Sequence, residues 1–158
     1  MNIWRLISHH QDAEKAILWC KEKSRIAIGW GKIGDLRQSA PQDASAITSL
    51  IQIVYPELNN ANLGGPSLWR LYSEMAIGDL VILSDGNKRQ AVMRVTGDYE
   101  WTDDRQHELS GSYYHQRSAE TTQDEPDELW KHCGAKVAAG ENIRWTLIRC
   151  NNPSNTHR

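Results

Sequence analysis

The sequence predicts an α+β fold in which a small, strongly bent mixed sheet, or partial barrel, is flanked by helices. Predicted strands outnumber predicted helices, and they do not alternate with helices as in a doubly wound sheet. The chain has 158 residues, of which 39% are hydrophobic, so it can form one core, whereas two domains would each be marginal. We therefore expect one domain over residues 1–150 and a polar tail over residues 151–158.

The first elements are a strand, a helix and a second strand. Residues 3–7 (IWRLI) are predicted to form a short apolar strand. Over residues 12–22 the apolar side chains recur at helical spacing, and Asp12 is a suitable N-terminal cap. Residues 25–30 (RIAIGW) form the second predicted strand, which ends in a glycine-rich turn.

The middle of the chain predicts two helices. Apolar residues at the i, i+3, i+4 and i+7 spacing indicate a helix over residues 43–54. A further helix is expected over residues 66–75, with Pro66 in its first turn, because the missing N–H of proline breaks no helical hydrogen bond there.

The remaining predicted elements are strands. Residues 79–83 (DLVIL) and 90–96 (QAVMRVT) are joined by a turn with an Asp-Gly pair, which favours a hairpin. Two more strands are expected over residues 112–120 and 142–150. Together with the strands before them they would complete the bent sheet.

The formal net charge of −2 is distributed unevenly along the chain. Residues 1–37 carry seven Lys/Arg against four Asp/Glu, and residues 129–158 carry five against one. Residues 98–128, by contrast, carry two against ten. This balance and a pI near 6.3 argue against a sequence-blind DNA binder, which typically has a basic stripe. They are compatible with a protein that recognises one particular site.

The sequence does not predict a membrane protein, a metal site or a disulfide framework. The longest apolar runs fall short of the ~20 residues that cross a bilayer, and the first residues lack the apolar core of a signal peptide. We therefore expect a cytoplasmic protein with no membrane partner. The three cysteines include no Cys-x-x-Cys pair, and the adjacent His9 and His10 have no clustered partners, so no metal site is expected.

Cofactor binding and catalysis are also not expected. Residues 29–34 (GWGKIG) match the dinucleotide pattern G-x-G-x-x-G, but Pro41 precludes a long helix after the third glycine, which that site requires. Asp98 and Glu100 would share one face of a strand, flanking Tyr99, without a further catalytic group. The sequence contains no G-x-S-x-G elbow. We therefore predict no cofactor, no catalytic residues and no enzyme activity.

The choice of aromatic residues is unusual. The chain contains seven Trp and five Tyr but no Phe. Drift in aromatic usage would explain this, and so would a polar-rimmed pocket, because Trp and Tyr combine a flat ring with a hydrogen-bonding group. Trp30 at a glycine-flanked strand end, and Tyr99 and Trp101 after another strand, could serve a site or the core. Trp69 and Tyr72 lie three residues apart on one helix face, where core packing is the simpler role.

Several motifs, taken in order, resemble a known family. They are IWRLIS, RIAIGWGKIGDL, SLWRLYSEMAIGDLVIL, AVMRVTGDYEW and SYYHQR, which span roughly residues 1–120. This set resembles the EVE-like branch of the PUA superfamily, most closely the modules at the N-termini of McrB-type modification-dependent restriction ATPases. In that family a Pro-Gly commonly follows the first strand's serine, whereas His9 and His10 follow it here.

The resemblance implies a pseudo-barrel that flips a modified base out of nucleic acid into an aromatic-walled pocket. In DNA-directed members the base is commonly a modified cytosine, while other members and the related YTH domains read modified RNA. We therefore expect a non-catalytic reader of a modified base, most simply modified cytosine in DNA, which acts either beside a separate effector nuclease or ATPase or as a stand-alone reader. The alternatives are a binder of modified RNA nucleotides, and a small-molecule or nucleoside-binding or -processing protein that reuses the pocket.

The same resemblance implies where the pocket lies. Ser8 would supply a hydrogen-bonding group at the end of the first strand, and Gly29 with Trp30 would form one wall. Residues 98–101 would supply an edge acceptor and a stacking face. The expected base-binding residues are Ser8, Gly29, Trp30, Trp69, Asp98, Tyr99, Trp101 and Tyr114.

Six side chains are expected to contact the nucleic-acid backbone. His115 and Arg117 match the family's Tyr/Pro-His-x-Arg strand, which tends to lie near the pocket mouth. Four basic residues elsewhere are candidates for phosphate contacts, with an ordinary solvated surface as the alternative. The expected set is Lys32, Arg37, Lys88, Arg94, His115 and Arg117.

Overall fold

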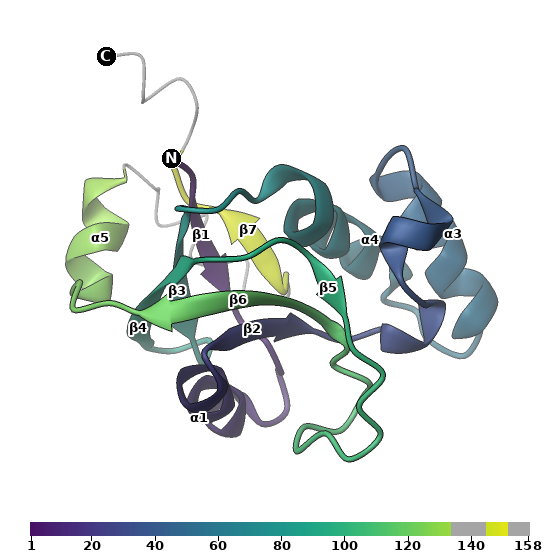
Figure 1. Cartoon of the computed structure of the whole chain (residues 1–158), viewed down its shortest axis with the longest axis horizontal. Coiled ribbons are helices and arrows are strands. Elements are labelled where there is room, and N and C mark those ends of the chain that lie inside the picture. Colours follow the sequence, from purple (N-terminus) through teal and green to yellow (C-terminus); the bar gives the residue numbers. More distant parts are fainter. Residues whose placement is uncertain (134–144, 152–158) are drawn as a thin grey trace.

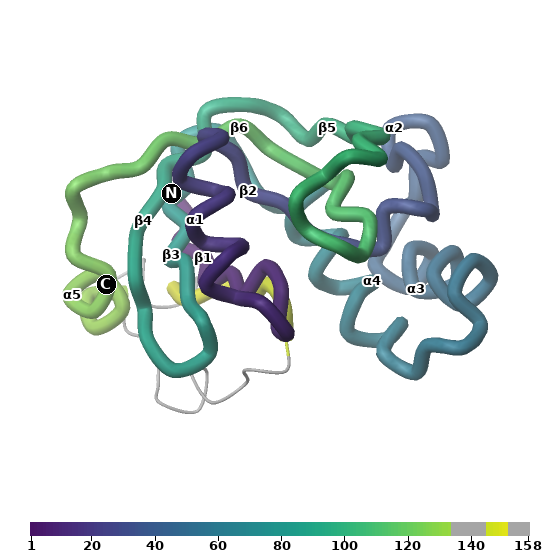
Figure 2. Tube along the Cα trace, turned by 90° about the horizontal axis from the view of Figure 1, so that it is seen from below, coloured from purple at the N-terminus to yellow at the C-terminus, as the bar shows by residue number. Residues whose placement is uncertain are grey.

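The computed structural model describes residues 1–133 and 145–151, and it confirms the α+β class. A strongly curled mixed sheet forms the centre of the molecule, and helices lie around it (Figure 1). Helices α3 (Ala44–Val54) and α4 (Ala61–Trp69) lie side by side at one end, far from α5 (Pro126–His132) at the other (Figures 1 and 2). Residues 142–144 of the last predicted strand, and residues 152–158 of the predicted tail, lie outside the described residues.

The described part of the sheet has the strand order β2-β6-β4-β3-β1-β7, with β5 paired to β6 beyond the end of β4. Within it β1 and β3 are parallel and the other neighbours are antiparallel. The strands are β1 (Ile3–Leu6), β2 (Arg25–Ile28), β3 (Leu80–Ser84), β4 (Arg89–Val95), β5 (Glu100–Trp101), β6 (His115–Thr121) and β7 (Leu147–Arg149).

The central strands β1 and β3 are buried along their whole length, because both faces of the sheet are covered there. Trp4 and Val81 belong to the main core, whereas Ile3 and Ile82 belong to a smaller cluster with Trp130. Strands buried on both faces have continuous apolar runs, without polar alternation. This explains why these strands could be predicted directly from the sequence.

The curl of the sheet brings the end of β1 next to β2, although they are far apart in strand order. The hydroxyl of Ser8, just after β1, donates a hydrogen bond to the backbone oxygen of Ala27 in β2. Ser8 was expected to bind the base, but its buried side chain instead closes the curled sheet.

The helices are α1 (Ala13–Lys23), α2 (Leu36–Ser39), α3 (Ala44–Val54), α4 (Ala61–Trp69) and α5 (Pro126–His132). A 3-10 turn (Gly31–Ile33) precedes α2, and a π turn (Arg70–Glu74) follows α4. The predicted helices over 12–22 and 43–54 are present as α1 and α3. Asp12 makes no side-chain cap, however, while Asp43 caps α3 by accepting from Ala46 N at 2.9 Å.

The prediction that a helix begins at Pro66 was wrong, because α4 begins at Ala61 and Pro66 lies inside it. Gly64 and Gly65 in the first half of α4 are typical of a loop, but here they allow close packing. A Cβ on Gly65 would lie 1.9 Å from Thr48 Oγ1 and 2.8 Å from Ala44 O of α3. The helix therefore extends across both glycines, since only residues without a side chain fit against α3.

We expect Gly65→Ala to lower the free energy of unfolding by about 1–3 kcal/mol, since the added methyl group must push α3 and α4 apart. Urea unfolding of the two proteins measures this difference. Asn62→Ala is the control, because Asn62 is exposed on the same helix and should change stability by less than about 0.5 kcal/mol. Equal stability of Gly65→Ala and the natural chain would contradict this account of the packing.

The start of the predicted tail is also different from expectation. Asn151 is buried, and its side-chain oxygen accepts from Ile3 N at 2.8 Å while its amide nitrogen donates to Met1 O at 3.1 Å. A polar residue is stable there because it satisfies backbone groups beside β1 that lack a strand partner.

Candidate functional site

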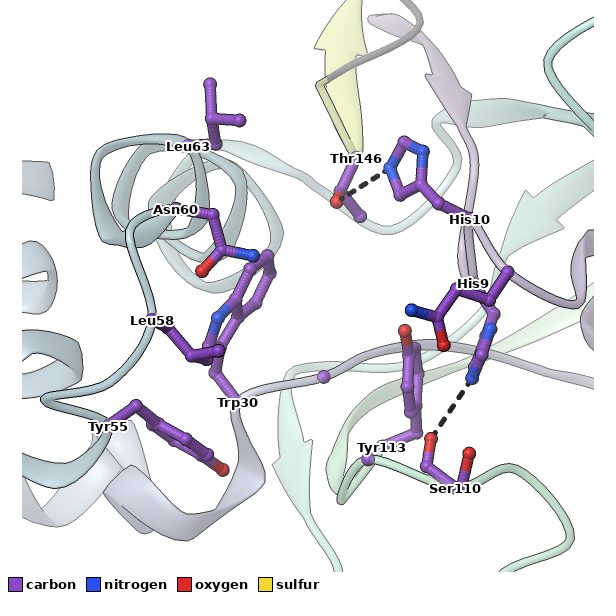
Figure 3. A pocket seen from close by; sticks show the side chains of 13 residues that line it. His9, His10, Trp30, Tyr55, Leu58, Asn60, Leu63, Ser110, Tyr113 and Thr146 are labelled. Atoms are coloured by element: carbon purple, nitrogen blue, oxygen red, sulfur yellow. Dashed lines mark hydrogen bonds between the residues drawn. The ribbon is translucent and has the colours of Figure 1, made fainter.

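A cavity of about 310 Å³ opens at the end of the curled sheet where β1 and β2 finish (Figure 3). Residues 9–11 after β1 and Thr146 before β7 line one side of it. Residues Gly29 and Trp30 after β2 line it, together with four residues between Tyr55 and Leu63. Figure 3 shows the Trp30 indole and the Tyr113 ring on opposite sides of the cavity.

Trp30 reaches this cavity through an unusual backbone conformation. Its φ and ψ of 61° and 32° lie in the left-handed region, which costs a non-glycine residue about 1–2 kcal/mol. Gly31 follows it and packs tightly, because its N–H donates to Ser112 O at 2.9 Å and a Cβ there would lie 2.3 Å from the same oxygen. The turn holds the indole against Gly64 of α4, where a Cβ would lie 2.9 Å from Trp30 Cε2.

A buried hydrogen-bond chain fixes the Trp30 backbone. His115 Nε2 lies 3.1 Å from Trp30 O, and His115 Nδ1 lies 2.6 Å from Tyr99 Oη. Nε2 must carry the proton, since its partner is a carbonyl, so Nδ1 accepts from the Tyr99 hydroxyl. That hydroxyl in turn accepts from Leu36 N at 3.2 Å. Burial lowers the pKa of His115 to about 4, so the ring is neutral at neutral pH.

The opposite wall is held by a second histidine. His9 stacks on Tyr113 with ring centroids 5.0 Å apart and planes inclined by 23°. His9 Nδ1 accepts from Asp12 N at 3.1 Å, so the proton is on Nε2, which donates to Ser110 O at 3.2 Å. Both ring nitrogens are therefore used: Nδ1 holds the turn after β1, and Nε2 joins that turn to the chain before β6. Burial raises the pKa of Tyr113, so its phenol stays protonated at neutral pH.

The described lining of the cavity contains no Lys, Arg, Asp or Glu. Burial, followed by the charge of Arg5 and by His9, lowers the pKa of His10, and burial raises the pKa of Tyr55. The described walls are therefore uncharged at neutral pH. Such a cavity penalises an ionised ligand and suits a neutral one.

Of the predicted pocket residues, Gly29 and Trp30 line the cavity. Trp101 and Tyr114 support it from behind: their rings meet edge to face, 5.8 Å apart, and Trp101 Nε1 donates to Gly31 O at 2.8 Å. Tyr99 is buried in the core beneath Trp30.

Two predicted pocket residues lie away from the cavity. Trp69 is half-buried against the main core, with its ring 6.2 Å from that of Tyr72. Asp98 is exposed and is not part of the lining. Neither side chain therefore lines this cavity.

The predicted backbone contacts divide into exposed and buried groups. Lys32, Arg37, Lys88 and Arg94 are exposed. Arg37 forms an ion pair with Asp35 at 2.8 Å, and Arg94 forms one with Glu120 at 3.5 Å. Lys32 lies beside the cavity, since its backbone N donates to Tyr55 Oη at 3.1 Å.

His115 and Arg117 are buried, which contradicts a role in contacting phosphate at the surface. Arg117 Nε donates to Leu71 O at 2.7 Å, and its other nitrogens donate to Met75 O at 2.8 Å and Gly97 O at 3.0 Å. The guanidinium therefore donates its hydrogen bonds to backbone oxygens and holds three segments of the chain together. The motif match had suggested a surface role, whereas both faces of this part of β6 are covered.

Sequence reasoning missed His9, Tyr55, Asn60 and Tyr113 as lining residues. Only weak features of the sequence pointed to these residues. His9 stands where EVE-like modules commonly have a Pro-Gly, and Tyr113 is the neighbour of Tyr114, which was among the expected pocket residues. Nothing in the sequence of the chain between α3 and α4 indicated that it would face the end of β1.

The described residues contain no group of three or more His, Cys, Asp or Glu side chains placed to hold a metal ion. Over the same residues, no helix is long and apolar enough to span a membrane.

Comparison with known families gives a match for most of the chain. A family model described as a domain of unknown function (DUF8426) matches residues 4–133, from β1 to the end of α5. No curated protein matches the chain. The matched range contains both aromatic walls of the cavity, and Thr146 lies beyond it.

Proposed function

The chain belongs to the DUF8426 family, and we propose that its cavity binds a single modified base flipped out of nucleic acid, without transforming it. The observation that carries this proposal is the uncharged cavity flanked by Trp30 and Tyr113 (Figure 3). Two rings on opposite sides of a neutral cavity suit a flat, neutral heterocycle, which stacks on them.

The size of the cavity supports a small ligand. Its volume of about 310 Å³ is at the lower end of the range for small-molecule pockets, which suits one base better than a larger cofactor. Flipping a base costs a few kcal/mol, and stacking on an aromatic side chain returns about 1–3 kcal/mol per base. Stacking plus hydrogen bonds to the base edge can therefore offset the cost of flipping.

Charge near the cavity predicts that the pocket, rather than the phosphates, controls affinity. Lys32 is exposed beside the cavity, whereas Arg37 and Arg94 are paired with carboxylates. A protein with few phosphate contacts shows a shallow dependence of affinity on salt. Discrimination would then come from contacts with the base.

The resemblance to EVE-like modules supports modified cytosine in DNA as the first candidate ligand. In that proposal a separate effector nuclease or ATPase acts once the base is bound, and the reader works in the cytoplasm beside it. Modified RNA is the second candidate, since related domains read it, and a free nucleoside is the third.

The test uses fluorescence anisotropy of matched labelled duplexes that contain plain, 5-methylated or 5-hydroxymethylated cytosine at one position. We expect tighter binding to one modified duplex, and we expect Trp30→Ala to weaken that binding about tenfold or more by removing a stacking surface. Trp69→Ala is the matched control, because Trp69 is half-buried outside the cavity. Its affinity should stay within about twofold of the natural chain.

Four outcomes would contradict parts of the proposal. Equal weak binding to all duplexes would remove DNA, and tighter binding to a modified single strand with 2′-hydroxyls would identify RNA as the ligand. Turnover of a modified nucleoside during the assay would show an enzyme. A loss of affinity in Trp69→Ala as large as that in Trp30→Ala would remove the cavity as the binding site.

A further inference from the structure

Asn60, in the wall of the cavity, has an unsatisfied hydrogen-bonding group. It precedes α4, and its backbone oxygen accepts from Leu63 N at 2.9 Å and Gly64 N at 3.1 Å, which fixes the position of the residue. Its side-chain oxygen is buried and has no hydrogen-bond partner among the described residues. A buried acceptor without a donor is destabilising, so a ligand that supplies a donor would be bound more tightly.

The location of Asn60 relative to Trp30 follows from helix α4. Gly64 packs against the indole, and Asn60 is four residues earlier, at the start of the same helix face. Figure 3 shows Asn60 and Trp30 on the same side of the cavity and Tyr113 on the other. A flat ligand stacked on the indole would therefore turn one edge toward the Asn60 amide.

Several other polar groups of the cavity already have partners. His9 uses both ring nitrogens, and the Tyr55 hydroxyl accepts from Lys32 N at 3.1 Å. His10 Nε2 lies 3.4 Å from Thr146 Oγ1. The amide of Asn60 can therefore hydrogen-bond to a ligand without breaking these bonds.

We propose that Asn60 pairs with the Watson–Crick edge of the flipped base, an inference that rests on the proposed function. Asn60 thereby selects bases whose modification lies outside that edge. A carboxamide has a donor and an acceptor side by side. The same edge of cytosine has the N4 amino donor beside the N3 acceptor, so two parallel hydrogen bonds can form. Half a turn of the terminal torsion exchanges the amide oxygen and nitrogen, so either order can be presented.

This pairing has a consequence for the class of ligand. A methyl or hydroxymethyl group at C5 of cytosine leaves the Watson–Crick edge intact, so the base can still pair with Asn60. A methyl group at N3 blocks the acceptor on that edge and makes the base a cation at neutral pH, which the uncharged walls also penalise. The cavity should therefore accept 5-substituted cytosine and reject N3-methylcytosine, although the N3-methyl base cannot pair in a duplex and is easier to flip.

The first experiment compares duplexes that contain 5-methyl, 5-hydroxymethyl or N3-methylcytosine at one position, using the natural chain and anisotropy. We expect the better 5-substituted duplex to bind at least tenfold more tightly than the N3-methyl duplex. Equal or tighter binding of the N3-methyl duplex would overturn the role of the Watson–Crick edge. This comparison needs no variant, so it does not depend on how any substitution folds.

The second experiment identifies the residue. Asn60→Ala should weaken binding of the preferred duplex about tenfold and bring its affinity close to that of the N3-methyl duplex. The control is Asn59→Ala, since Asn59 is the exposed neighbour and should change affinity less than twofold. Unchanged affinity in Asn60→Ala, with Trp30→Ala still impaired, would overturn this inference and leave the proposed function standing. A natural chain without preference for any modified duplex would overturn both.

Discussion

Replacing Arg117 by methionine should lower the free energy of unfolding by about 3 kcal/mol or more. The guanidinium donates to the backbone oxygens of Leu71, Met75 and Gly97, and methionine would leave these three acceptors without their donor. Each buried polar group left unsatisfied costs about 1–3 kcal/mol. Since the bonds join β6 to the turn after α4 and to the bend after β4, the loss should affect the whole fold.

Urea unfolding measures this effect, and Arg94→Met is the matched control. Arg94 is exposed on β4 and pairs with Glu120 at 3.5 Å, so its loss should cost less than about 1 kcal/mol. Arg117→Lys should fall between the two, because one ammonium group cannot reproduce the planar set of donors. Similar stabilities for Arg117→Met and Arg94→Met would show that the buried bonds contribute little.

Acidification should destabilise the fold through His115. Burial lowers its pKa in the folded protein to about 4, from a usual value of 6.5, so between these pH values the unfolded chain binds a proton that the folded chain excludes. The stabilisation is therefore complete above pH 6.5 and is lost as the pH falls toward 4. The shift corresponds to about 3 kcal/mol over that range.

Unfolding by urea at several pH values between 7 and 4 tests this, with His115→Gln as the variant. Glutamine does not titrate, so the dependence of unfolding free energy on pH should be shallower by about 3 kcal/mol across the range. His132→Gln is the matched control, because it makes the same replacement at an exposed histidine at the end of α5. An unaltered pH dependence in His115→Gln would refute the proposed exclusion of the proton.

The elements that could be predicted from the sequence are those with strong periodicity or long apolar runs. Strands β1, β3 and β4, and helices α1 and α3, lie within one or two residues of their predicted bounds. The start of α4 was missed because its glycines serve packing against α3, which no local pattern reveals. Strand β5, with two residues, and helices α2 and α5 were not expected.

The candidate site was only partly predictable for a different reason. Trp30 could be identified because its flanking glycines mark an unusual backbone locally. The opposite wall, with His9 and Tyr113, exists because the sheet curls and brings distant segments together. His115 and Arg117 were expected to contact phosphates because they match a strand that lies near the pocket mouth in EVE-like modules, but their burial here depends on what covers β6.

The backbone conformation of Trp30 limits how this protein can be stabilised by engineering. Its left-handed conformation is one that glycine adopts freely, so this position gives up stability to keep an indole there. Glycine at position 30 would relieve this strain, but it would also remove an indole that packs against the core and forms one wall of the cavity, so the two effects on stability oppose each other. An engineering campaign on this scaffold should hold position 30 fixed and look for added stability at sites distant from the cavity.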